Sequence, residues 1–337
     1  MRITREFILK FANELVDRRQ FSGRDLTAVY ICGSFLEESY QLGDTGDVDL
    51  VMIHNEKPEL ERELVRLTDD LHLDISHQDQ REYRDTRRLR VHPWTGPTLN
   101  ACRIIHDPGH FLDFVQASVR GQFDRPDHIY ARSRAQMDRA RELWFELTGQ
   151  ESGDALVPLQ KYLSAVEKAA NSIASLSGMP LAERRLLFEF PQRAEALSLP
   201  GLYPGLLGLL GAPNLDAGAL TVWIEHWKNA YWSAPSENRP VRLAAERLHY
   251  YLGGFRAALE GEQPAALLWP LLNTWTDLMQ CYPDEAPERA NWRSAVEKLE
   301  LYGKAQKQRL QALDAYLDLI EEALEDWAHR NGAWESA

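Results

Sequence analysis

Cysteine, long apolar runs and a surplus of positive charge are all scarce or missing in this 337-residue sequence. The three cysteines, Cys32, Cys102 and Cys281, are odd in number and lack metal-ligand spacing, which favours a reducing compartment over a disulfide framework. No run of about 18 apolar residues occurs, so no membrane-spanning helix is expected. Because the first residues are charged throughout and lack the apolar centre of a signal peptide, we expect a cytoplasmic protein.

The charge balance is acidic, with a formal net charge of −13 at pH 7. Proteins that hold a nucleic-acid backbone usually carry a basic excess or a basic patch, so nucleic acid is not expected as a partner. A small cationic or neutral partner fits this charge better, and no membrane partner is expected. The sequence leaves a homodimer open.

The length of the chain and its hydrophobic content of 44% predict two folded domains. Residues 1–125 mix strand and helix patterns and predict an α/β (α+β) domain, whereas residues 126–337 predict an all-α domain. The strands expected in the first domain are residues 27–33, 48–54, 71–77 and 100–106.

Helices are expected on both sides of the domain boundary. The first begins at Thr4, and a second covers residues 57–71, where Leu60, Leu64, Leu67 and Leu71 recur at helical spacing. Residues 199–213, rich in Gly, Pro and Leu, are expected to form a connector. The other expected helices are residues 110–121, 131–150, 157–178 with Gly178 as its stop, 218–232, 240–261 and about 285–330.

The stretch that carries chemistry is ICGSFLEESYQLGDTGDVDLVMIH, residues 31–54. Asp47 and Asp49 point the same way on a strand, because side chains alternate with a period of two. Two like charges side by side need a positive counter-charge, and a hard divalent cation with oxygen ligands supplies one. Upstream, Gly33 has no side chain, so the following backbone N–H groups and the Ser34 hydroxyl can approach a phosphate.

A third carboxylate lies on another apolar strand. In LHLDISH, residues 71–77, Asp74 faces away from Leu73 and Ile75. If this strand neighbours the strand of Asp47 and Asp49, the three carboxylates can hold two divalent ions about 3.5–4 Å apart, as in-line nucleotidyl transfer requires.

Gly33-Ser34, twelve intervening residues, Asp47-Val48-Asp49 before an apolar run, and the later Asp74 resemble the signature of the polymerase-β-type nucleotidyltransferase superfamily. The small bacterial branch that includes aminoglycoside nucleotidyltransferases is the most similar in layout. This resemblance implies a short mixed sheet followed by a helical domain. It also implies that Gly33 and Ser34 bind the nucleotide phosphates and that Asp47, Asp49 and Asp74 are catalytic ligands of two Mg²⁺ ions.

The loop FLEESYQLGDTG departs from this signature, because it carries Glu37 and Glu38 and has no Arg for the triphosphate. One alternative cation source is Lys161 with Lys168 and Asn171, which share one side of a helix. The other source is residues 80–90, with Arg81, Arg84, Arg87, Arg88 and Arg90. The base for the acceptor hydroxyl stays open between metal activation at Asp74 and a carboxylate such as Glu167 or Glu82.

Two functions follow from the resemblance. The first is an enzyme that moves a nucleoside monophosphate, with AMP from ATP favoured, onto a hydroxyl of a small acceptor, which can be cationic, such as an aminoglycoside. The nucleoside triphosphate is then the co-substrate. The alternative is a toxin–antitoxin-type or regulatory protein that modifies or binds a partner protein. In the helical part, Arg242 and His249 loosely resemble the Arg and His pair of HEPN domains.

Overall fold

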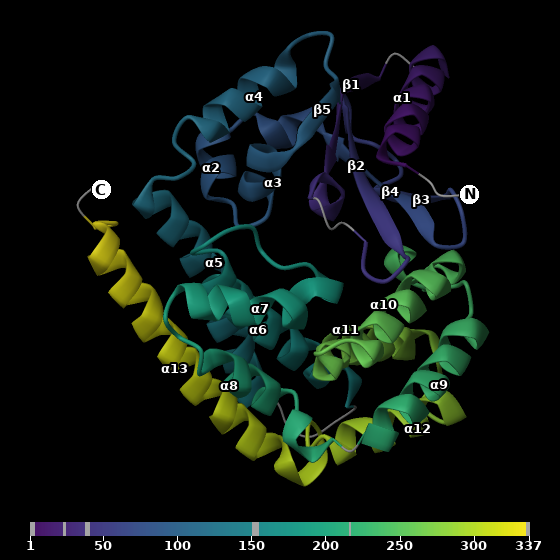
Figure 1. Ribbon diagram of the computed structural model, residues 1–337, viewed down its shortest axis with the longest axis vertical. Coiled ribbons are helices and arrows are strands. Elements are labelled where there is room, and N and C mark those ends of the chain that lie inside the picture. Colours follow the sequence, from purple (N-terminus) through teal and green to yellow (C-terminus); the bar gives the residue numbers. More distant parts are fainter. Residues whose placement is uncertain (1–3, 23–24, 38–40, 150–154, 216, 335–337) are drawn as a thin grey trace. The chain divides into compact units, whose positions relative to one another are not determined.

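The computed structural model describes residues 4–22, 25–37, 41–149, 155–215 and 217–334. The chain divides into two compact units, Met1–Phe123 and Asp124–Ala337. The first unit holds a sheet with helices, and the second holds helices (Figure 1). The domain limits 1–125 and 126–337 stay a prediction, because compactness alone does not show that either unit folds independently.

The sheet has five strands in the order β3-β4-β2-β1-β5. Their bounds are β1 (Leu26–Cys32), β2 (Gly46–His54), β3 (Arg62–Arg66), β4 (Leu71–Asp79) and β5 (Arg103–His106). β2 runs parallel to β4, whereas the β1–β2, β1–β5 and β3–β4 pairs are antiparallel. This arrangement confirms the expected fold, a short mixed sheet with helices followed by an all-helical region.

The two faces of the sheet have different partners because side chains alternate along each strand. Val48, Leu50 and Met52 of β2 pack in one core with residues of α1 (Arg5–Ser22). Val51 and Ile53 face the other way, into a core shared with α2 (Thr86–Val91), α3 (Thr95–Ala101) and α4 (Phe111–Arg120). Figure 1 shows α1 on one side of the sheet and these three helices on the other.

The helix expected over residues 57–71 is wrong. This segment contains strand β3, which pairs antiparallel with β4. Leu60, expected on an apolar helix face, is 53% exposed, and Leu71 belongs to β4. The helical spacing of the leucines does not decide the structure here, because the edge of β4 offers backbone hydrogen-bond partners. Such tertiary pairing readily overrides a weak helix propensity.

The second unit contains helices around one large apolar core. They are α5 (Pro126–Thr148), α6 (Leu156–Ala174), α7 (Leu186–Ala196), α8 (Leu202–Leu209), α9 (Ala217–Ser233), α10 (Leu248–Glu260), α11 (Leu268–Leu278), α12 (Pro287–Lys298) and α13 (Gln306–Asn331). α5 and α9 confirm the helices expected there. Within the described residues, no helix has the length and apolar content that crossing a membrane requires.

Several expected helix limits differ from the structure. The connector expected at residues 199–213 contains α8, and α6 ends at Ala174 rather than at Gly178. The helix expected over residues 240–261 begins only at Leu248, after two short 3-10 turns. The last expected helix is two helices, α12 and α13, because Glu300 and Gly303 between them have positive φ angles of 57° and 78°.

Candidate metal centre

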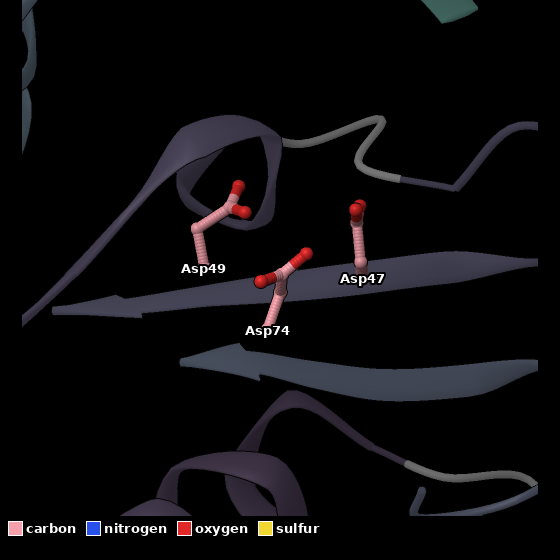
Figure 2. A group of neighbouring side chains, drawn as sticks. All are labelled: Asp47, Asp49 and Asp74. Carbon is pink, nitrogen blue, oxygen red and sulfur yellow. The ribbon is translucent and has the colours of Figure 1, made fainter. Parts of the chain in front are cut away.

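Three aspartates from two adjacent strands meet on one face of the sheet. The parallel register of β2 and β4 places Asp49 opposite Asp74 and Asp47 opposite His72. Each of Asp47, Asp49 and Asp74 offers a carboxylate oxygen, and these oxygens all lie within 4.8 Å of one another (Figure 2). The expected meeting of these carboxylates, here called the aspartate triad, is confirmed. Their catalytic and metal-binding roles stay predictions.

The triad concentrates negative charge in a partly buried place. Asp74 is buried, whereas Asp47 and Asp49 are half-buried. Cys32, which pairs with Asp49 across β1 and β2, responds to this charge. Burial raises the pKa of the Cys32 thiol well above its usual value, and the negative charge of Asp49 raises it further. Cys32 is therefore held as a thiol and not as a nucleophilic thiolate.

Gly33 closes one side of the triad. It follows β1, opens the 3-10 turn η1 (Gly33–Leu36) and has a φ of 72°, a conformation that favours glycine. A Cβ at this position would lie 3.1 Å from Asp49 Cγ and closer still to its Oδ2. The backbone conformation therefore favours glycine, and a larger residue here would have to displace the Asp49 carboxylate. Phosphate binding by Gly33 and Ser34 stays a prediction.

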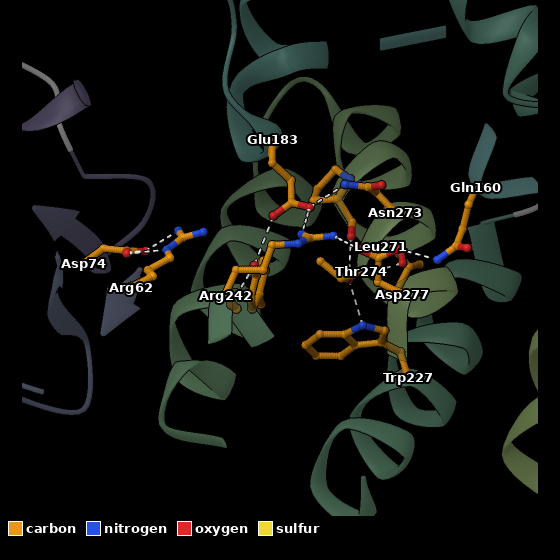
Figure 3. A network of polar contacts seen from close by, with 12 residues as sticks. Arg62, Asp74, Gln160, Glu183, Trp227, Arg242, Leu271, Asn273, Thr274 and Asp277 are labelled. Carbon is orange, nitrogen blue, oxygen red and sulfur yellow. Dashed lines mark hydrogen bonds and ion pairs between the residues drawn. The ribbon is translucent and has the colours of Figure 1, made fainter. Parts of the chain in front are cut away.

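Arg62, which sequence reasoning missed, holds the third aspartate. Its Nε donates to Asp74 Oδ1 and its Nη2 to Asp74 Oδ2, both at 2.6 Å (Figure 3). The strand register places Leu64 opposite Asp74 and Arg62 opposite Ser76, so Arg62 is a diagonal neighbour of Asp74. Residues 62–66, Arg-Glu-Leu-Val-Arg, show no polar–apolar alternation that would mark a strand, and the leucine spacing favours a helix.

The triad fits a hard divalent cation. Its donors are carboxylate oxygens, the ligands that Mg²⁺ and Ca²⁺ prefer, and they come from a rigid pair of strands. The close approach of Gly33 leaves no side chain between η1 and Asp49. Asp74 already has a positive partner in Arg62, so a cation would share this carboxylate with the guanidinium or displace it. The chemistry of the site does not identify the ion.

A series of hydrogen-bonded polar side chains lies on the face of the sheet opposite the triad, because side chains alternate between the two faces in β2 and β4. Hydrogen bonds join Asp25 to His54 at 2.9 Å, His54 to His77 at 2.8 Å, and His77 to Glu63 at 2.9 Å. Arg19 also donates to Glu63. Burial lowers the pKa of His77, and Glu63 only partly offsets this. Burial alone would raise the pKa of Glu63, but hydrogen bonds from Arg19 and His77 lower it overall.

The lysines expected to assist the nucleotide lie in the helical unit, where each has an acidic neighbour. Lys161 pairs with Glu146 at 2.8 Å, and Lys168 with Glu167 at 3.3 Å. Asn171 does not share their exposed side: it is fully buried and bonds the backbone of Leu181 in both directions. Nucleotide binding by Lys161 and Lys168 stays a prediction.

The arginine-rich run forms the 3-10 turn η2 (Gln80–Tyr83) and helix α2. Arg81 pairs with Asp79, and Arg90 donates to Gln122 and to the Ser118 carbonyl, both at 2.8 Å. The remaining members of the run, Arg84, Arg87 and Arg88, are exposed. In the loop after Ser34, Glu37 is exposed, and Glu38 lies outside the described residues.

The two carboxylates considered as a base have other bonds. Glu82 accepts the Asp79 N–H at 3.3 Å in a capping box at the start of η2. Glu167 is paired with Lys168 in the helical unit. Neither contact supports a role for these residues at the triad, and the base stays unassigned.

Arg242 belongs to a polar network within the helical unit (Figure 3). It forms ion pairs with Glu183 and Asp277. Burial alone would lower the pKa of Arg242, but the charges of its acidic partners raise it above its usual value. Further donors to the two carboxylates are Tyr251, Asn273 and Gln160. His249 is exposed, and these bonds give Arg242 a structural role that does not need it.

Comparison with known proteins assigns no family. No protein-family model matches the chain, and a search of curated proteins finds no match. What is shown is an N-terminal mixed sheet that carries three neighbouring aspartates, followed by an all-helical region. The function therefore has to be argued from the triad and its neighbours.

Proposed function

We propose that this protein is a metal-dependent nucleotidyltransferase that moves a nucleoside monophosphate, with AMP from ATP favoured, onto a hydroxyl of a small acceptor. The observation that carries the proposal is the aspartate triad, whose carboxylate oxygens from two parallel strands lie within 4.8 Å of one another. A compact set of three carboxylates suits two divalent ions, which serve in-line displacement at a phosphate.

In this proposal Asp47 and Asp49 hold both Mg²⁺ ions, and Asp74 holds the ion nearer to the acceptor. Divalent ions bound there would neutralise phosphate charge and lower the pKa of the acceptor hydroxyl. Gly33 brings the backbone of η1 close to Asp49, so that N–H groups and the Ser34 hydroxyl can bind the nucleotide phosphates.

The cation that the loop after Ser34 lacks is supplied by Arg62 in this proposal. Arg62 already lies at the triad through its two bonds to Asp74, and its side chain is 39% exposed. A guanidinium offers a fork of donors that matches phosphate as well as carboxylate. Lys161 and Lys168 are proposed as further cations for the triphosphate. The acidic chain suits a cationic acceptor such as an aminoglycoside.

The test is incubation with each α-labelled nucleoside triphosphate and Mg²⁺, against a panel of aminoglycosides and a cell extract. We expect label on a small acceptor together with released pyrophosphate, and loss of both with Asp47→Asn or Asp49→Asn. Asp44→Asn is the matched control, because Asp44 is an exposed carboxylate outside the triad. Label on protein alone would support the regulatory alternative, and absence of any transfer would contradict the proposal.

A further inference from the structure

A hollow in the N-terminal unit lies outside the aspartate triad. It has a volume of about 330 Å³ and lies between the end of β4, the η2–α2 segment and the start of α3. No triad residue lines it. Its volume falls within the range of about 300–1,000 Å³ that is usual for small-ligand sites.

Two arginines that form no direct ion pair in the described residues line this hollow, although the charge of Arg84 adds to the hydrogen bonds from Arg81 in lowering the pKa of nearby Asp79. Arg84 and Arg88 are exposed, and in the part of the chain that the structure describes neither guanidinium forms an ion pair or a hydrogen bond. Arg81 also lines the hollow but is bonded to Asp79. Two unpaired guanidiniums at one concave surface repel each other unless an anion lies between them.

The acids at the same hollow have local roles. Asp85 accepts the Arg88 N–H at 3.1 Å as the cap of α2, and Glu82 accepts the Asp79 N–H at 3.3 Å. Each carboxylate therefore accepts a backbone N–H, and in the described residues neither bonds the guanidinium of Arg84 or Arg88. The lining includes three arginines against these two acids, so its formal charge is positive in an otherwise acidic chain.

His92 adds a neutral donor. Its Nδ1 accepts the N–H groups of Trp94 at 3.3 Å and Thr95 at 3.0 Å, so the neutral ring carries its proton on Nε2. Burial lowers the pKa of His92, and the charge of Arg88 lowers it further. An anion beside this ring would reverse that effect and raise the pKa.

We propose that Arg84, Arg88 and the Nε2–H of His92 bind the phosphate group of a small molecule. Guanidinium forks and an N–H donor match the several acceptor oxygens of a tetrahedral dianion. A small ligand is favoured over nucleic acid because the hollow is confined and the chain carries a formal charge of −13.

This hollow shares two lining residues with a neighbouring one. A neighbouring hollow of about 410 Å³ shares Gln78 and Glu82 with it and is lined by Arg62, the partner of Asp74. A phosphate-bearing ligand would thus lie one hollow away from the Arg62–Asp74 pair. The proposal does not depend on the nucleotidyl transfer proposed above.

The test is calorimetric titration with inorganic phosphate and with glycerol 3-phosphate, at constant ionic strength and with a chelator present. We expect saturable binding by the unaltered protein and a dissociation constant about tenfold higher in Arg84→Gln and in Arg88→Gln. Arg87→Gln is the matched control, because Arg87 is exposed in the same helix but does not line the hollow. Asp49→Asn should bind phosphate unchanged.

The imidazole resonances of His92 provide an independent readout. Phosphate should raise the pKa of His92 in the unaltered protein and much less in Arg88→Gln. Tighter binding of glycerol 3-phosphate would assign the site to a phosphorylated metabolite, and equal binding would assign it to free phosphate. Absence of saturable binding, equal weakening in Arg87→Gln, loss in Asp49→Asn, or tighter binding of a single-stranded oligonucleotide would each overturn the proposal.

Discussion

Arg62 and Asp74 form a two-pronged ion pair across β3 and β4, with both donor–acceptor distances at 2.6 Å (Figure 3). The Asp74 side chain is 3% exposed and the Arg62 side chain 39%, so a buried acid is paired with a partly exposed base. Arg62 thus provides a positive charge for one of the three carboxylates of the triad. A divalent cation at the triad would compete with Arg62 for Asp74, and this competition can be measured.

Arg62→Met should make the protein more dependent on Mg²⁺ for its stability. Without the guanidinium, Asp74 is left buried beside two other carboxylates. We expect a loss of about 2 kcal/mol in the free energy of unfolding without Mg²⁺, below the value for a fully buried pair because Arg62 is partly exposed. Mg²⁺ should recover more stability in this variant than in the unaltered protein. Urea unfolding followed by circular dichroism measures both.

Arg66→Met is the control for that experiment. Arg66 lies on the same strand, but it pairs with Asp69 at the surface, where an ion pair contributes little. Equal losses in the two variants, or no extra effect of Mg²⁺ in Arg62→Met, would show that Arg62 does not act through the triad.

Gly33→Ala should disturb the triad as well as the backbone. The new Cβ would have to occupy a positive φ of 72° and would collide with the Asp49 carboxylate. We expect a loss of about 2 kcal/mol in the free energy of unfolding and weaker binding of divalent cations. Gly109→Ala is the matched control, since a Cβ there meets no atom within 4 Å. If the two variants are equally stable and bind Mn²⁺ equally, the close packing of Gly33 on Asp49 is refuted.

Arg242→Gln should destabilise the helical unit. It removes the cation between Glu183 and Asp277 and leaves two carboxylates without their charged partner. We expect a loss of about 3 kcal/mol in the free energy of unfolding. Tryptophan fluorescence follows this unit, because Trp94 is the only tryptophan in residues 1–123. Arg256→Gln, at an exposed position of α10, should have almost no effect. A similar loss in both variants would argue against the network.

The stability of the protein should fall with acidification in two steps. The pKa of His77 lies below its ordinary value of 6.5, so the unfolded state binds this proton more readily, and stability falls as the pH drops below about 6.5. The pKa of Glu63 lies below its ordinary value of 4.5, so a second loss begins near that pH. His77→Gln should make the first step smaller, because burial also lowers the pKa of His92 and of His106, and should keep the second, in urea unfolding between about pH 8 and pH 4.

His249→Gln, an exposed histidine in α10, is the control and should keep both steps. If His77→Gln retains the full loss near pH 6.5, then His77 is not the group responsible for it.

The triad could be predicted from sequence because its signal is local. Asp47 and Asp49 are two residues apart on an apolar strand, and Asp74 alternates with Leu73 and Ile75. These patterns fix which side of a strand each carboxylate occupies. The pairing of β2 with β4 joins segments that are distant in the sequence. The sequence contains no direct sign of this pairing, and the predicted site simply requires it.

Arg62 could not be found in the same way because its strand was concealed. Leucines at residues 60, 64, 67 and 71 fit a helix, and only the free edge of β4 decides for a strand. The position of Arg62 beside Asp74 depends on that long-range pairing, so the error in secondary structure hid a residue of the site.

In the helical unit, long-range packing also decides two features that the local sequence does not predict. α8 forms in a Gly- and Pro-rich segment because Leu202, Leu206 and Leu209 are buried in the core, and Pro204 lies in its first turn, where proline is tolerated. Asn171 is buried because the buried surface of α6 is wider than its apolar stripe. Two hydrogen bonds to the Leu181 backbone satisfy its amide.

The most direct test of the proposed metal centre is calorimetric titration of the unaltered protein with Mn²⁺ as a substitute for Mg²⁺. The account predicts saturable binding, weakened about tenfold or more in Asp49→Asn and in Asp74→Asn and unchanged in Asp44→Asn. Binding of equal strength in the unaltered protein and in Asp49→Asn, or no binding to the unaltered protein, would contradict it.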